Sequence, residues 1–219
     1  MLEKKEKLTV MDFWLKLIFF PKEYFRENFD EKEKPYFWFV ITIFGLSNAI
    51  DRIDNQFVKH DLAGTFEKIE FLNNWLSYWV LASISALVTS YLIYLVGGWF
   101  YNLRVEWAKG KSNTDSSRFL YLYTSFIPSV VYVISTLCQT LARNRPYILG
   151  EDENYGQLFL SLIMVLITFY SVYVSYCGVS IVMKPDKWKA RFWFLFLPIL
   201  GYSLAILTLL ALITSMQNT

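Results

Sequence analysis

Five long runs of apolar residues dominate this sequence, and none of them contains Lys, Arg, Asp or Glu. They cover residues 36–50, 75–101, 119–142, 158–183 and 192–215. A helix needs about 20 mainly apolar residues to cross a hydrocarbon core of about 30 Å. The composition agrees, because 55% of the residues are hydrophobic and only 18% are charged, against about 25% charged in soluble domains. The sequence therefore predicts an all-α, polytopic integral membrane protein.

The runs also predict how the chain is organised. We expect a membrane domain over residues 36–215 that forms a five-helix transmembrane bundle, preceded by a cytoplasmic segment over residues 1–35. The expected spans lie at about 36–53, 75–101, 119–142, 158–183 and 192–215. The first run is the shortest and ends in the polar sequence DRIDNQ, so it defines its span least well.

The distribution of Lys and Arg predicts the orientation of the bundle. Eight of these residues precede the first run, four lie between the second and third runs, and four lie between the fourth and fifth. The alternate segments contain three, two and none. Because basic residues of short loops stay on the cytoplasmic side, the N-terminus is expected inside and the C-terminus outside.

A short apolar helix is expected before the first span, over residues 9–20, TVMDFWLKLIFF, with Asp12 and Lys16 on its polar side and Pro21 at its end. Its apolar face carries Phe13, Trp14, Leu17 and Ile18. An amphipathic helix of this kind lies in the membrane interface and anchors there through its apolar side chains. The alternative is that the same face packs beneath the bundle as a protein contact.

Polar residues inside the runs suggest a polar seam between spans. The four candidates are Thr89, Ser129, Tyr132 and Tyr173. Such a seam could hold a lipid headgroup or a small neutral solute. It offers no charge for coupled ion transport, which usually needs an intramembrane ionisable group. The alternative is close helix packing, because small residues also recur four apart, as at Ala82, Ala86 and Ser90.

No motif for catalysis or for a cofactor is visible. The chain has a single histidine, His60, in a segment expected to be a loop, and it lacks HExxH, GxSxG and a phosphate-binding glycine loop. Two acidic groups could supply oxygens to a divalent cation, although a solvated outer face explains them more simply. They are Asp51, Asp54, Asp61, Glu67 and Glu70, and Glu151, Asp152 and Glu153. We therefore expect neither an enzyme nor a cofactor, and the net charge of +2 gives no reason to expect a nucleic-acid partner.

The order of several segments resembles a known family. "LIFFPKEYFRE", "VGGWFY", "FLYLYTSFIPSVVYVI" and "YSVYVSYCGVSIVMKPDKWKARFWFLFLPIL" together resemble the membrane domain of the Yip (Ypt-interacting protein) family in its prokaryotic form. That resemblance implies five spans, with a glycine pair late in the second and a proline in the third. The Asp-Leu-Tyr-Gly-Pro motif of eukaryotic members does not occur before the first span, so the resemblance does not carry a GTPase partner over to this chain.

The function expected from these observations is that of a non-enzymatic, Yip-like integral membrane protein that scaffolds partners or shapes the membrane. The alternative is a transporter, channel or lipid-moving protein that uses the polar seam. Membrane lipids are the expected partners, with other membrane proteins or a second copy of the chain as further candidates. The expected location is the bacterial cytoplasmic membrane.

Overall fold

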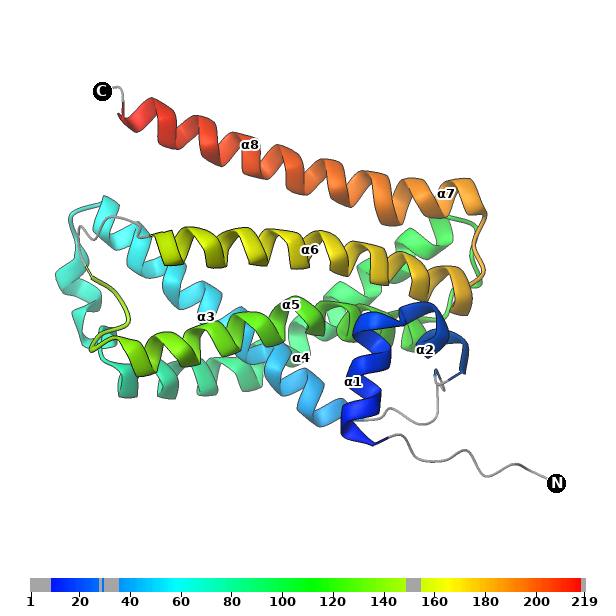
Figure 1. The fold of residues 1–219 in the computed structure, drawn as a ribbon, viewed down its shortest axis with the longest axis horizontal. Coiled ribbons are helices and arrows are strands. Elements are labelled where there is room, and N and C mark those ends of the chain that lie inside the picture. Colours follow the sequence, from blue (N-terminus) through cyan, green and yellow to red (C-terminus); the bar gives the residue numbers. More distant parts are fainter. Residues whose placement is uncertain (1–8, 28, 30–35, 149–154, 218–219) are drawn as a thin grey trace.

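The computed structural model describes residues 9–27, 29, 36–148 and 155–217. All secondary structure in this part of the chain is helical (Figure 1). The elements are α1 (Val10–Phe19), α2 (Pro21–Glu27), α3 (Phe37–Leu62), the 3₁₀-helix η1 (Phe66–Leu72), α4 (Trp75–Trp107), α5 (Thr114–Ala142), α6 (Tyr155–Val182), α7 (Lys187–Arg191), the π-helix η2 (Phe192–Phe196) and α8 (Leu197–Gln217). The long helices run roughly along one axis, and α1 lies across it (Figure 1).

Polar caps and a proline set the helix boundaries. Asn74 caps α4 by accepting a hydrogen bond from the backbone N–H of Leu76, at 2.8 Å, and Asn113 caps α5 in the same way. Pro21 is the first residue of α2, a position where its missing N–H has no cost. The proline therefore separates α1 from α2 and also starts α2.

Small residues let α3, α4 and α5 approach closely. Ala82, Ala86 and Ser90 form a buried stripe on α4. A Cβ atom added to Gly45 of α3 would lie 2.8 Å from the carbonyl oxygen of Ala86, so only a glycine fits there. The close packing predicted from the four-residue spacing is confirmed at this contact.

Within the described residues, four helical segments are long and apolar enough to cross a membrane: α4, α5, the part of α6 from Phe159, and the segment Lys187–Thr208 formed by α7, η2 and the start of α8. The expected first span, 36–53, corresponds to the N-cap and first two thirds of α3, which is not among them. This helix does not end at the polar sequence DRIDNQ but continues to Leu62, so its second half carries charged side chains. The fold is thus an all-helical membrane bundle, and the expected five spans are not confirmed.

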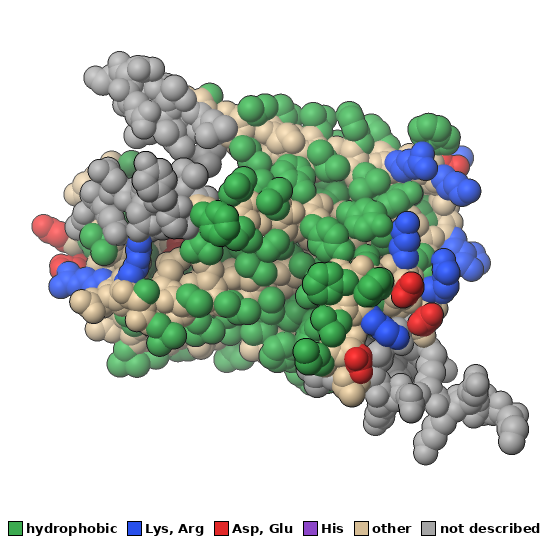
Figure 2. Space-filling model, viewed as in Figure 1, with side chains coloured by type: hydrophobic (Ala, Val, Ile, Leu, Met, Phe, Trp, Pro, Cys, Tyr) green, Lys and Arg blue, Asp and Glu red, His purple; other side chains and the backbone are tan. Residues whose placement is uncertain are grey.

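Basic side chains gather at one end of the bundle. There, the turn after α4 and the turn after α6 are joined by backbone hydrogen bonds, Lys111 N–H to Met183 O at 2.7 Å and Asp186 N–H to Ala108 O at 3.0 Å. The surrounding basic side chains are Lys109, Lys111, Lys184, Lys187, Lys189 and Arg191. We call this the basic end; Figure 2 shows Lys and Arg gathered there, with hydrophobic side chains along the flank of the bundle.

The opposite end is closed by Tyr147, which follows α5. Its hydroxyl donates to Asp61 and its backbone N–H donates to Asn73, at 2.8 and 2.9 Å. Burial and the bond to Asp61 raise the pKa of Tyr147 to about 12, so the hydroxyl keeps its proton at neutral pH. The tyrosine thereby joins the segment after α5 to both ends of the α3–α4 connection.

Candidate functional site

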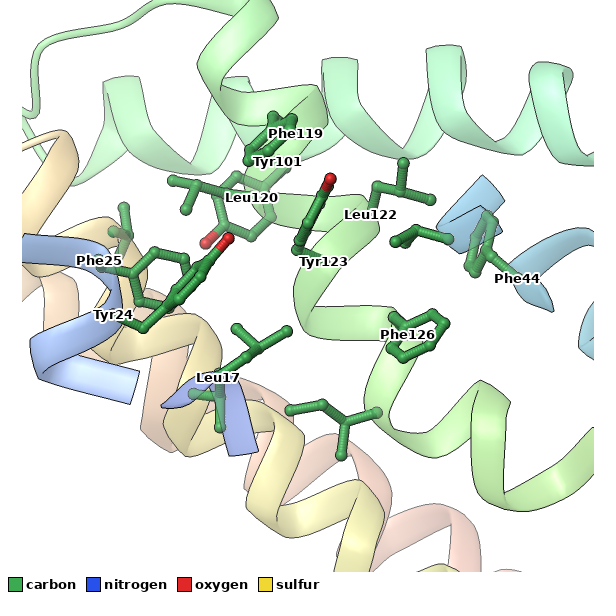
Figure 3. Packing of buried hydrophobic residues seen from close by; sticks show 14 of the residues in the cluster. Leu17, Tyr24, Phe25, Phe44, Tyr101, Phe119, Leu120, Leu122, Tyr123 and Phe126 are labelled. Carbon is green, nitrogen blue, oxygen red and sulfur yellow. The ribbon is translucent and has the colours of Figure 1, made fainter. Parts of the chain in front are cut away.

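The helix α1 packs directly on the bundle. Phe13 and Leu17 are completely buried, and the ring of Trp14 stacks on that of Phe126 of α5, with centroids 4.1 Å apart and planes at 17°. Figure 3 shows Leu17 close to Tyr24 of α2, with α5 beside them. The face expected to dip into lipid therefore contacts protein, as in the alternative raised from the sequence.

Backbone and ionic contacts add to this packing. The hydroxyl of Tyr170 of α6 donates to the carbonyl oxygen of Ile18, one of the carbonyls at the end of α1 that lack a partner within the helix. Lys16 forms an ion pair with Glu27 of α2 at 3.8 Å. The helices α1 and α2 are thus integrated into the bundle from several directions.

The other face of α1 is apolar as well and is exposed. Met11, Leu15 and Phe19 follow one another at four-residue spacing, with exposed fractions of 72%, 43% and 66%. Phe20, directly after the helix, is also exposed. The exposed apolar residues here are therefore these four, whereas Phe13 and Leu17 are buried and Trp14 and Ile18 are partly buried against the bundle. The sequence pattern identified one apolar stripe where the helix carries two.

The contact of Trp14 with Phe126 shows where α1 lies along α5. Phe126 lies seven residues after Phe119, the first residue of the apolar part of α5. At 1.5 Å per residue, Trp14 is held about 10 Å inside that boundary. Amphipathic helices that lie in the interface typically insert their apolar side by about 5–10 Å. The distance of Trp14 from the start of this apolar part is comparable with that insertion.

A polar pocket of about 280 Å³ lies between α3, α5 and α6. Two seam candidates, Ser129 and Tyr132, line it together. The remaining lining residues are Phe44, Ser47, Asn48, Asp51, Ser125, Pro128 and Met164. Pro128 lies in the middle of the part of α5 that lines the pocket, and it has no N–H to donate to the helix.

The other two seam candidates lie elsewhere. Thr89 donates to the carbonyl oxygen of Ser85 within α4, at 2.7 Å. Tyr173 is on α6 with an exposed fraction of 39%. Neither lines the pocket, so the structure brings together only Ser129 and Tyr132.

Next to this pocket lies a carboxylate, that of Asp54, which the sequence pattern did not include in the polar seam. Asp54 of α3 accepts hydrogen bonds from the hydroxyls of Tyr78 and Tyr132, one on each oxygen and both at 2.8 Å. The first expected span ends at residue 53, so the sequence pattern places Asp54 among the solvated acidic residues that follow it. A helical projection of α3 beyond that residue places Asp54 on the same side as the buried Ile50 and Phe57, and this was the available signal.

The groups considered for metal binding do not converge. Among the described residues, no three His, Cys, Asp or Glu side chains lie close enough together to hold an ion. His60 bonds to Thr65 at 2.9 Å rather than to Asp61. The candidates Glu151, Asp152 and Glu153 lie outside the described residues.

The apolar helices, the lipid-facing flank and the close small-residue contacts define a multi-pass helical membrane protein. Residues 15–214 match the model of the Yip1 domain, so the chain belongs to the Yip1 domain family, as the resemblance predicted. No curated protein and no solved structure matches the chain.

Proposed function

We propose that this protein is a non-enzymatic Yip-family protein that shapes or organises the membrane, with α1 acting as a wedge in one leaflet. The observation that carries the proposal is the exposed apolar stripe Met11, Leu15 and Phe19 on a helix whose opposite face is buried in the bundle. The stripe lies at the depth of the acyl-chain boundary. It therefore adds apolar volume to one leaflet and not to the other.

Rigid attachment distinguishes this helix from a loosely associated amphipathic segment. Phe13 and Leu17 fix it by burial, and Tyr170 fixes its C-terminal end. A wedge that is held by the bundle cannot leave the leaflet when the local curvature changes. The expected partners are lipids first, and then other membrane proteins or a second copy through the apolar flank of the bundle.

The proposal includes five spans with the N-terminus in the cytoplasm. The helix α3 has 26 residues, a length of about 39 Å, which is sufficient to cross the hydrocarbon core. Its carboxylate Asp54 has two tyrosine donors, which lowers the cost of placing it near the bilayer. The excess of Lys and Arg at the basic end supports a cytoplasmic position for that end.

Membrane deformation by purified protein tests the wedge. Wild-type protein reconstituted into large liposomes is expected to tubulate them or reduce their size, as seen by cryo-electron microscopy. The double variant Leu15→Asn, Phe19→Asn should lose this effect, since it removes the outer apolar stripe without touching the buried one. The control Phe71→Asn makes the same change at an exposed site of η1 and should behave as wild type. Liposomes left unchanged by wild-type protein would contradict the proposal.

The polar pocket supports a second candidate function, the passage or binding of a small polar solute. It is lined by hydroxyl and amide groups and by Asp51, a carboxylate. Flux assays with proteoliposomes separate the two candidates. Release of an entrapped neutral solute that is abolished by Ser129→Leu would favour transport, whereas deformation without release favours the wedge.

A further inference from the structure

Arg104 lies near the basic end of α4 without an anionic partner. The ion pairs formed within the described part of the chain are Lys16–Glu27 and Arg118–Asp115, and neither includes Arg104. Its guanidinium lies 4.4 Å from the ring centroid of Phe194, and its Nε is buried without a hydrogen-bond partner. Removing a charge from water without a counter-charge is costly, so this position favours an anion.

The backbone of η2 fixes the position of this side chain. In the π-helix, the N–H of Leu197 bonds to the carbonyl oxygen of Phe192, five residues earlier. The next bond of this type would join residue 198 to Trp193, but Pro198 has no N–H. The Nη2 of Arg104 donates to the carbonyl oxygen of Trp193 instead. The arginine is thereby held in place by Nη2, while its side chain borders an open space beside α4.

That space is an apolar groove of about 510 Å³ on the flank of α4. Its lining residues are Leu92, Ile93, Val96, Gly97, Phe100, Tyr101, Arg104 and Tyr121. Along α4 it extends from Leu92 to Arg104, which is about 18 Å at 1.5 Å per residue. Leu92, Val96 and Phe100 are each at least half exposed, so the groove opens toward lipid. Arg104 is the only charged residue of its lining.

The groove runs in the direction of a lipid molecule. Gly98 lies against Arg118, in the polar first turns of α5, so Arg104, further along α4, lies at headgroup level. From there the groove extends toward the bilayer centre. Exposed basic residues also border this end of α4; they are Lys109, Lys111, Lys184, Lys187 and Arg191. Basic residues near a membrane surface attract anionic lipids.

Two acidic side chains near this end of α4 already have hydrogen-bond partners. Glu106 accepts hydrogen bonds from Asn102 and Ser112, both at 2.9 Å. Asp186 caps α7 by accepting from the N–H groups of Trp188 and Lys189. The charge of Arg104 is therefore left for a ligand from outside the chain.

We propose that this groove binds one anionic phospholipid, with its phosphate on the guanidinium of Arg104 and an acyl chain along Leu92, Val96 and Phe100. Arginine suits the phosphate because its planar fork donates two hydrogen bonds at once. The site is separate from α1, so the proposal holds whether or not α1 deforms membranes.

Native mass spectrometry of the purified protein in detergent tests the site, with dioleoylphosphatidylglycerol as the anionic probe and dioleoylphosphatidylcholine as its zwitterionic counterpart. Wild-type protein should retain one phosphatidylglycerol in preference to phosphatidylcholine. Arg104→Gln should weaken phosphatidylglycerol binding about tenfold, the effect of losing a charge-assisted hydrogen bond. Glutamine keeps a polar side chain of helix-forming type at this position, so the fold is expected to persist, and circular dichroism checks it.

Two further variants separate a lipid groove from a simple anion site. Val96→Trp fills the groove at an exposed position and leaves Arg104 intact, so it should also weaken phosphatidylglycerol binding. Arg118→Gln removes a cation of the same end that already pairs with Asp115 and should bind as wild type. Unchanged binding in Arg104→Gln or in Val96→Trp would overturn the proposal. So would displacement of the lipid by millimolar inorganic phosphate, because the occupant would then be free phosphate.

Discussion

The hydroxyl of Tyr132 donates a hydrogen bond of 2.8 Å to the carboxylate of Asp54, 78 residues earlier in the sequence. Tyr78 donates to the second oxygen at the same distance. One carboxylate thus joins α3, α4 and α5 at the level where α4 begins. Away from bulk water, an ionised carboxylate depends on such donors, so this contact fixes the relative positions of three helices.

Removing one of these donors should destabilise the bundle. In Tyr132→Phe the ring remains and the hydroxyl is lost, so the free energy of unfolding is expected to fall by about 1–3 kcal/mol. Tyr91→Phe, on the exposed face of α4, is the control and should change it by less than about 0.5 kcal/mol. Reversible unfolding in mixed detergent micelles measures both. Equal stability of the two variants would show that the hydroxyl of Tyr132 contributes nothing.

The two faces of α1 should respond differently to the same substitution. Leu17 is completely buried, whereas Leu15 is 43% exposed. Leu17→Ala is expected to cost about 2–5 kcal/mol of stability, because it leaves a cavity in the core. Leu15→Ala should cost well under half as much. The reverse order, measured in the same unfolding assay, would mean that Leu17 faces lipid after all.

Glycine positions offer a second matched pair. A Cβ atom at Gly98 would lie 2.6 Å from the Cα of Arg118, whereas one at Gly201 would have no heavy atom within 4 Å. Gly98→Ala is therefore expected to force α4 and α5 apart and to destabilise the protein by about 1–3 kcal/mol. Gly201→Ala should leave stability unchanged or raise it by up to about 1 kcal/mol, because alanine favours the helix. Thermal unfolding followed by circular dichroism ranks the two variants, and a Gly98→Ala protein as stable as wild type would disprove the close contact.

Single-cysteine labelling tests the orientation. In a background without Cys138 and Cys177, cysteine at position 60 is expected to react with an impermeant maleimide in intact cells. Cysteine at position 109 should react only after the membrane is opened, because Lys109 belongs to the basic end. Labelling of position 109 in intact cells would reverse the orientation.

The sequence by itself determined the class of this protein. Long apolar runs without charged residues are stable only inside a bilayer or a very large core. In a bilayer, a helix forms all of its backbone hydrogen bonds within its own segment. Small residues four apart, as at Ala82, Ala86 and Ser90, indicated where helices meet, because spacing along one helix decides which side chains share a face. The family resemblance also followed from the order of these local patterns.

Only the tertiary structure decided which face of each helix meets protein and which meets lipid. In a bilayer both are apolar, so hydropathy cannot distinguish Leu17 from Leu15, or the buried stripe of α1 from the exposed one. The hydrogen-bond partners of the polar groups could not be predicted from the sequence, for a related reason. The contacts of Asp54 with Tyr132 and of Arg104 with Trp193 join residues 78 and 89 positions apart, and such pairs depend on how the helices are arranged around one another, which no local pattern of the chain specifies.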